Sequence, residues 1–196
     1  VPMHERVQQG DWDVSNVRWP SVYGKRIGIM GLGRIGTEIA KRATGFDLEI
    51  GYHNRSERID LAYPYFDNLP ALAKWRDYLV CASPGGDSTR NAINAEVLKN
   101  LGPDGILVNI GRGSVVDTEA LVKALKTRII AGAGLDVIEG EPDVPKSAIG
   151  LQNLTMTPHI AGNCPEAMIA KQELFLKNVE LCLNGYPPST PISEKY

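Results

Sequence analysis

The sequence has few cysteines, few aromatic residues, no long apolar run and almost no net charge. Its 3 cysteines, Cys81, Cys164 and Cys182, are far apart and lack C-x-x-C spacing, which argues against a disulfide framework and a zinc site. A reducing, cytoplasmic setting is expected, with no bound metal. The net charge of -2 gives no electrostatic reason to expect nucleic acid. No apolar run approaches the roughly 20 residues that span a bilayer, so no membrane partner is expected.

The remaining composition is that of an ordinary globular protein. The chain has 196 residues, of which 43% are apolar and 22% charged, enough for one domain with a core. Its polar N-terminus has no signal-peptide pattern. Because the chain begins with Val1 and not Met, we expect a piece of a longer protein.

From Arg26 onward, short apolar segments alternate with helical patterns. Most of the apolar segments lack period-2 alternation, as expected for strands buried on both faces. We expect strands at 27–30, 48–53, 78–82, 106–110, 129–135 and 154–156, and helices at 35–44, 69–75, 95–101, 117–125 and 165–183. This order predicts an α/β Rossmann fold with a doubly wound parallel sheet. Residues 1–25 have little periodicity and are expected to form an arm or linker, and the Pro-rich segment 186–192 an extended tail.

The first expected strand runs straight into Gly31-x-Gly33-x-x-Gly36, and a helical pattern follows at once. In this context Gly31 permits a tight turn, Gly33 lets the backbone approach a pyrophosphate, and Gly36 allows close helix packing. The helix N-terminus then faces the phosphates. A glycine-rich turn without a ligand is the alternative, but the strand–turn–helix context favours dinucleotide binding.

No acidic residue ends the second expected strand, where NAD-binding folds place one for the ribose 2′-OH. Neutral Asn54 stands there, followed by Arg55 and Ser56, which can pair with a 2′-phosphate. The acids Glu57 and Asp60 come only after the strand end. The pattern favours NADP(H), with NAD(H) possible, over a solvated loop with an incidental arginine.

Three later segments carry side chains that could do chemistry. Arg112 lies between two glycines after the fourth strand and can hold a carboxylate by a bidentate contact, although an ion pair with a nearby acid is the alternative. Asp136, Glu139 and Glu141 follow the fifth strand, and His159 follows the sixth. A lone histidine is more often structural. Here, however, the three segments together offer a carboxylate anchor, a proton donor and an acid that stabilises the protonated donor. This combination suits the reduction of a 2-keto acid.

Together these motifs resemble the D-isomer-specific 2-hydroxyacid dehydrogenase family. The resemblance covers about residues 25–183 and rests on the segments 31–36, 109–117, 135–142 and 157–162, in the family's order and spacing. The subgroup it most resembles is the NADPH-dependent glyoxylate/hydroxypyruvate and hydroxyphenylpyruvate reductases. The resemblance implies a D-stereospecific oxidoreductase whose substrate is a small 2-keto or 2-hydroxy acid.

The resemblance also implies roles for matching residues. Arg112 would bind the keto acid, His159 would be the general acid–base, and Glu141 would pair with His159, Glu139 being the weaker candidate. Asp136 would contact the nicotinamide carboxamide. Further cofactor contacts would come from Arg34 and Ile35 at the pyrophosphate, and from Ser83, Pro84, Thr89, Ile110, Gly111 and Gly162.

One departure from the family pattern limits the prediction. The family's own N-terminal substrate segment, with its glycine loop, is absent. We therefore expect residues 1–25 to be an arm that contacts a homodimer partner, 26–164 to be the NAD(P)-binding domain, and 165–196 to be an interdomain helix and tail of a largely missing substrate domain. Such a fragment would bind cofactor with little activity and expose apolar surface near the last helix. A dinucleotide-sensing corepressor-like regulator of the same fold family is the alternative function.

Overall fold

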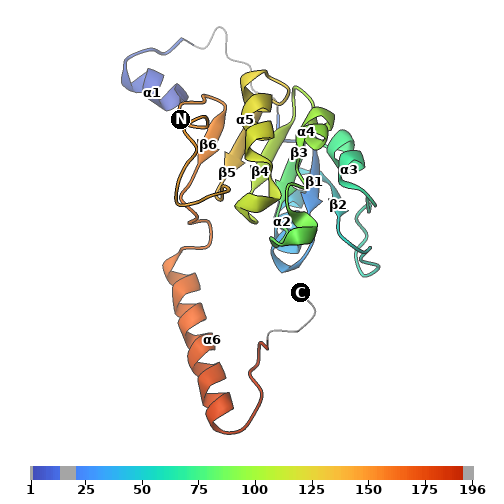
Figure 1. Cartoon of the computed structure of the whole chain (residues 1–196), viewed down its shortest axis with the longest axis vertical. Coiled ribbons are helices and arrows are strands. Elements are labelled where there is room, and N and C mark those ends of the chain that lie inside the picture. The colour runs from blue at the N-terminus through green and yellow to red at the C-terminus, as the bar shows by residue number, and fades with distance from the viewer. Residues whose placement is uncertain (1, 14–20, 192–196) are drawn as a thin grey trace. The chain divides into compact units, whose positions relative to one another are not determined.

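The structure is a computed structural model that describes residues 2–13 and 21–191 (Figure 1). It forms two compact units, Val1–Pro158 and His159–Tyr196. Parts of the expected arm and tail, residues 1, 14–20 and 192–196, lie outside the described residues. Where the sequence suggested an arm without periodicity, the structure has a short helix, α1 (Pro2–Gln8). An ion pair of 2.6 Å between Arg6 and Asp11 joins this helix to the turn after it.

The first unit is built on a parallel sheet of 6 strands in the order β2-β1-β3-β4-β5-β6. The strands are β1 (Arg26–Met30), β2 (Glu49–His53), β3 (Tyr78–Cys81), β4 (Ile106–Asn109), β5 (Gly132–Leu135) and β6 (Leu154–Met156). Because β1 lies between β2 and β3, the strand order reverses there, and ligands of such folds bind at the carboxyl ends of the strands beside that point. The predicted doubly wound Rossmann-like sheet is confirmed.

The expected helices connect the strands: α2 (Arg34–Ala43), α3 (Leu69–Trp75), α4 (Ala95–Leu101) and α5 (Thr118–Lys126). Side-chain caps explain where three of them begin. Asn68 accepts a hydrogen bond from the backbone N–H of Ala71, Asn94 accepts from Val97, and Asp117 accepts from Ala120. Short 3-10 turns follow β3, at Asp87–Thr89, and β4, at Gly113–Val115.

The largest difference from the expected elements is at β5, which begins at Gly132 and not at residue 129. The N–H of Ile129 donates to the carbonyl of Ala124 in α5, so Ile129 belongs to the turn that follows this helix. Ile130 is fully buried in the same turn. An apolar residue buried in a turn has the same sequence signature as one in a buried strand, which explains the error. The other strands differ by at most one residue at an end.

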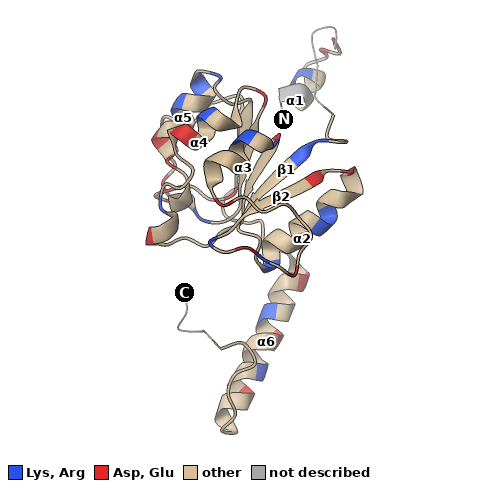
Figure 2. Ribbon diagram, turned by 90° about the vertical axis from the view of Figure 1, so that its right-hand side faces the viewer, with Lys and Arg blue, Asp and Glu red and all other residues tan. Residues whose placement is uncertain are grey.

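Helices cover both faces of the sheet, and each face has its own hydrophobic core. Figure 2 shows α2 on one side of β1 and β2 and helices α3, α4 and α5 on the other. The α2 side buries Ile29, Leu32 and Ala40 around the fully buried Tyr52. The larger core packs leucines from α3, α4 and α5 against β3 and β4.

Arg76, at the end of α3, is a buried arginine that the described residues leave partly unsatisfied. It is only 4% exposed, and its Nε and Nη2 atoms have no hydrogen-bond partner among the described residues. Gly28 in β1 makes room for its side chain, since a Cβ there would lie 2.8 Å from the Arg76 Cγ. Burial lowers the pKa of Arg76 to about 10. The guanidinium therefore remains charged at neutral pH and is poorly compensated.

We expect Arg76→Met to raise the free energy of unfolding by about 1–4 kcal/mol, because methionine fills similar space without a buried charge. Urea denaturation at pH 7 measures this. The pKa of Arg76 in the folded protein lies below its value in the unfolded chain. The loss of stability caused by the buried charge is therefore fully present at pH 7 and declines only above about pH 10. Lys74→Met on the exposed side of α3 is the matched control. If the Arg76→Met variant is less stable than wild type, the expectation is wrong.

The second unit consists mainly of α6 (Pro165–Leu183), as the sequence predicts. None of its residues is buried within the described chain, and it exposes apolar side chains all along its length: Met168, Ile169, Leu174, Phe175, Leu176, Val179 and Leu183. The chain then turns back, and Asn178 accepts hydrogen bonds from the N–H and hydroxyl of Ser189. Across the described residues, every helix is too short or too polar to span a bilayer.

Candidate active site

Three loops meet at the carboxyl edge of the sheet around the backbone of Ser83. Gly31, after β1, has φ +94°, and a Cβ there would lie 2.6 Å from the Ser83 backbone N and Cα. Gly111, after β4, would place a Cβ 2.5 Å from the Ser83 carbonyl oxygen. Both glycines are therefore needed for this close contact. Ser83 itself is buried, and Thr89 closes the same loop by donating a hydrogen bond of 2.9 Å to the Pro84 carbonyl.

The glycine turn has the features of an anion cradle. A Cβ on Gly36 would lie 2.3 Å from the Gly31 carbonyl oxygen, so α2 packs directly onto the turn. Gly33 is exposed, and among the described residues, its chain neighbours aside, no atom lies within 4 Å of where a Cβ would stand. Gly33 caps α2 without a side-chain hydrogen bond, and the first turn has no acid. Its N–H groups are thus open to a dinucleotide pyrophosphate, with Arg34 and Ile35 exposed beside them.

The residues after β2 divide into one that contacts the glycine turn and two that face solvent. The Asn54 Oδ1 accepts a hydrogen bond of 2.7 Å from the N–H of Leu32. This contact holds the end of β2 against the glycine turn, a role the sequence did not indicate. Arg55 and Ser56 are exposed and make no polar contact with the described residues. They are therefore placed to meet a ligand without breaking an existing bond.

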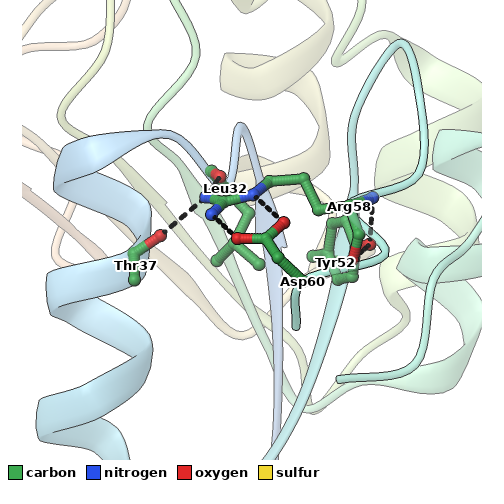
Figure 3. A network of polar contacts seen from close by, with 5 residues as sticks. All are labelled: Leu32, Thr37, Tyr52, Arg58 and Asp60. Atoms are coloured by element: carbon green, nitrogen blue, oxygen red, sulfur yellow. Dashed lines mark hydrogen bonds and ion pairs between the residues drawn. The ribbon is translucent and has the colours of Figure 1, made fainter. Parts of the chain in front are cut away.

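Arg58 completes the connection between this loop and the glycine turn (Figure 3). Its Nη1 donates to the Leu32 carbonyl at 3.1 Å and to the Thr37 Oγ1 at 3.2 Å. Its Nε donates to Asp60 at 3.0 Å, and its Nη2 contacts the second oxygen of the same carboxylate. Buried Tyr52 holds the Arg58 backbone, accepting from its N–H at 2.8 Å.

The loop after β4 presents Arg112. The fully buried Asn109 shapes this loop, accepting from the Gly111 N–H and donating to the Arg112 carbonyl, both at 3.0 Å. The Arg112 side chain is exposed and lies against Gly85, where a Cβ would be 3.1 Å from its Cγ. Its Nη1 donates to the Gly111 carbonyl at 2.7 Å. Ile110 donates its N–H to the Cys81 carbonyl and continues the sheet into this loop.

The segment after β5 packs directly onto the Arg112 loop. A Cβ on Gly113 would lie 2.1 Å from the carbonyl carbon of Ile138, so the two backbones touch. Asp136 is only 7% exposed; its N–H donates to the Asn109 carbonyl, and its carboxylate accepts a 2.5 Å hydrogen bond from Thr157. The segments after β4, β5 and β6 therefore meet at Asn109, Asp136 and Thr157.

The two candidate glutamates of this segment have different partners. Glu139 forms an ion pair of 3.0 Å with Arg90. Glu141 accepts a hydrogen bond of 3.3 Å from the Ile138 N–H and also has other interactions. Glu139 thus pairs with a neighbouring cation. The bond that Glu141 accepts from Ile138 holds its carboxylate beside the same backbone that Gly113 touches.

His159 and Gly162 belong to the second unit, so their relation to Arg112 and Glu141 stays a prediction. His159 has φ +53°, a left-handed conformation that is uncommon for residues other than glycine, although histidine adopts it more often than most. Such conformations cost energy and concentrate at functional sites. His159 also makes interactions within the structure, so it is not free.

Three further residues shape the site, although no role was predicted for them from the sequence: Asn109, Gly113 and Arg58. A polar residue ending an otherwise apolar strand was the available signal for Asn109, and a glycine after the Arg112 position was the signal for Gly113. Nothing local indicates that Arg58 shapes the site, because the contacts that join it to the site are to Leu32 in the glycine turn and Thr37 in α2. Within the described ranges, no three His, Cys, Asp or Glu side chains gather so as to hold a metal ion.

Known proteins are similar to this chain in sequence and in fold. The chain is 41% identical over 187 residues to a hydroxyphenylpyruvate reductase of Plectranthus scutellarioides, a match covering 95% of the chain and 60% of that protein. It is 40% identical to a glyoxylate/hydroxypyruvate reductase A of Arabidopsis thaliana, with the same coverages of 95% and 60%. The chain therefore spans about 60% of the length of these relatives.

A solved structure agrees with the sequence matches. The crystal structure of the NADPH-dependent glyoxylate/hydroxypyruvate reductase of Sinorhizobium meliloti, in complex with NADP and malonate, superposes with a TM-score of 0.89 at 40% identity. That match covers 98% of this chain and 62% of the other. The family sequence model named D-isomer specific 2-hydroxyacid dehydrogenase, NAD binding domain, matches residues 1–161. The chain therefore belongs to the D-isomer specific 2-hydroxyacid dehydrogenase family and contains its NAD binding domain.

Proposed function

We propose that this chain is the cofactor-binding part of a reductase that converts a small 2-keto acid, such as glyoxylate or hydroxypyruvate, to the D-2-hydroxy acid. The observation that carries the proposal is the meeting of three segments at one sheet edge. These are the open glycine turn at Gly33, the exposed Arg112 and the 136–141 segment, joined through Ser83 and Gly113. The match to named reductases supports the same reaction class.

The proposed cofactor is NADP(H). The pyrophosphate would lie at Gly33 and the first turn of α2, and Asp136 would meet the carboxamide. Arg55 and Ser56, exposed after β2, would meet the 2′-phosphate. NADP in the crystal structure of the Sinorhizobium relative supports this choice. When bound, the reduced nicotinamide supplies the hydride.

The side chains of the chain supply binding and the proton. Arg112 would hold the substrate carboxylate through paired N–H groups. His159 would donate its proton to the C2 carbonyl oxygen as C2 gains the hydride, which gives the hydroxyl group. Glu141 would orient His159 for this proton transfer. In the reverse direction, His159 would accept the hydroxyl proton.

We further propose that the whole protein is a homodimer with a second, substrate-binding domain, and that this chain alone has little activity. The support is that the chain matches about 60% of its relatives and that α6 leaves its apolar side chains exposed. Exposed apolar surface of this extent usually has a partner.

The proposal is tested by fluorescence titration of this chain with NADPH and NADH, and by NADPH oxidation with glyoxylate or hydroxypyruvate. We expect NADPH to bind more tightly, and turnover to require the full-length protein. In that protein His159→Gln should lower kcat by about 10²–10⁴-fold, with NADPH affinity unchanged.

Each part of the proposal can fail separately. Tighter binding of NADH would contradict the cofactor choice. Equal turnover by this chain and the full-length protein would contradict the view that the chain is an incomplete enzyme. NADPH binding by the full-length protein without keto-acid-dependent oxidation would favour the alternative, a dinucleotide-sensing regulator.

A further inference from the structure

The ion pair between Arg58 and Asp60 lies directly beside the glycine turn (Figure 3). Arg58 touches the turn itself, through the Leu32 carbonyl, and α2, through Thr37. The loop follows β2, the strand whose carboxyl end meets the adenosine ribose in folds of this kind. The Asp60 carboxylate is therefore held, by way of Arg58, next to the place where NADP(H) and NAD(H) differ.

Arg58 has little hydrogen-bonding capacity left. A guanidinium has five N–H donors. Four of them are engaged in the structure: two by Leu32 and Thr37, and two by the carboxylate of Asp60. A phosphate that approached Arg58 could form a paired contact only by replacing Asp60, because the bonds to Leu32 and Thr37 belong to the glycine turn and α2.

Replacement of the Asp60 carboxylate by a phosphate at Arg58 is physically feasible. The Asp60 side chain is 60% exposed and that of Arg58 is 34% exposed, so neither charge is buried. Ion pairs exposed to this degree are weak, whereas charge-assisted bonds to a phosphate are strong. The hydrogen bond from Arg58 lowers the pKa of Asp60, so the competing carboxylate is ionised at neutral pH.

We propose that Asp60 is a specificity-determining residue that disfavours NADP(H), by occupying the Arg58 guanidinium with a carboxylate that the 2′-phosphate must displace. The proposal rests on the proposed function, since it assumes dinucleotide binding at the glycine turn. It assigns opposite effects to neighbouring residues: Arg55 and Ser56 would favour the phosphate, and Asp60 would oppose it.

The test is the dissociation constant of NADPH and of NADH for this chain and for Asp60→Asn, measured by cofactor fluorescence. Asparagine keeps the size of the side chain and removes its charge. We expect Asp60→Asn to bind NADPH about fivefold more tightly, since the ion pair it removes is weak. NADH affinity should change less than twofold, because NADH has no 2′-phosphate.

Two further variants separate the ion pair from general charge. Glu57→Gln removes one negative charge from the same exposed loop, where Glu57 makes no polar contact with the described residues, and should change NADPH affinity much less. In an Arg58→Met background, Asp60→Asn should have no more effect than Glu57→Gln, because the cation through which Asp60 acts is gone. Thermal unfolding of each variant confirms that the fold is intact.

The outcomes distinguish this inference from the function on which it rests. If wild type binds NADPH and Asp60→Asn binds it no better than Glu57→Gln does, the role of Asp60 is overturned and the proposed function stands. If neither wild type nor Asp60→Asn binds either dinucleotide, both are overturned.

Discussion

Gly33→Asp is expected to lower the NADPH affinity of this chain by about 100-fold or more without lowering its stability. Gly33 caps α2 with φ -84° and ψ -156°, a conformation open to any residue, and a Cβ there would meet no atom of the described part of the chain within 4 Å, apart from its chain neighbours. Aspartate is a good N-cap, so its carboxylate should bond to the first-turn N–H groups in place of the pyrophosphate. It would also repel the phosphates, and like charges brought together cost several kcal/mol.

Fluorescence titration and urea denaturation measure the two effects on the same sample. Gly33→Asn is the matched control, because asparagine caps a helix equally well but has no charge. It should weaken binding less than aspartate does. Binding by Gly33→Asp within threefold of wild type would show that the N-terminus of α2 is not the phosphate site.

Gly113→Ala is expected to destabilise the protein by about 3 kcal/mol, because the added methyl group has no space. Its Cβ would lie 2.1 Å from the carbonyl carbon of Ile138, 2.2 Å from the Ile138 oxygen and 2.5 Å from the nitrogen of Glu139. All three are backbone atoms, and the bond from Asp136 to Asn109 anchors the same segment. The alanine must therefore push apart the loops that carry Arg112 and Glu141.

Urea denaturation gives the change in unfolding free energy. Gly45→Ala is the control, because Gly45 is exposed and a Cβ there would meet nothing within 4 Å. It should change stability by less than about 0.5 kcal/mol. In the full-length protein, Gly113→Ala should also reduce kcat more than it reduces NADPH affinity. If Gly113→Ala is as stable as Gly45→Ala, the close contact between these loops is wrong.

Local chemistry explains which elements could be predicted. The helix expected at 117–125 begins where Asp117 caps α5, and such a start can be predicted because a cap depends on residues only three positions apart. The helices at 69–75 and 95–101 agree with the structure for the same reason, since Asn68 and Asn94 cap them. The helix at 165–183 also agrees, although its N-cap residue Cys164 makes no side-chain hydrogen bond. The start of β5 was misplaced because burial of Ile130 in a turn and burial in a strand leave the same apolar pattern.

The sequence by itself determined the sheet, the glycine turn and the edge where the candidate residues meet. In a parallel sheet the carboxyl ends of all strands lie on one edge, so the order of the motifs was sufficient. Only the tertiary structure decided which side chains there are already engaged. Asn54 and Arg58 bond to Leu32 across 22 and 26 residues of chain. Such contacts depend on how two loops approach each other, which no local pattern encodes.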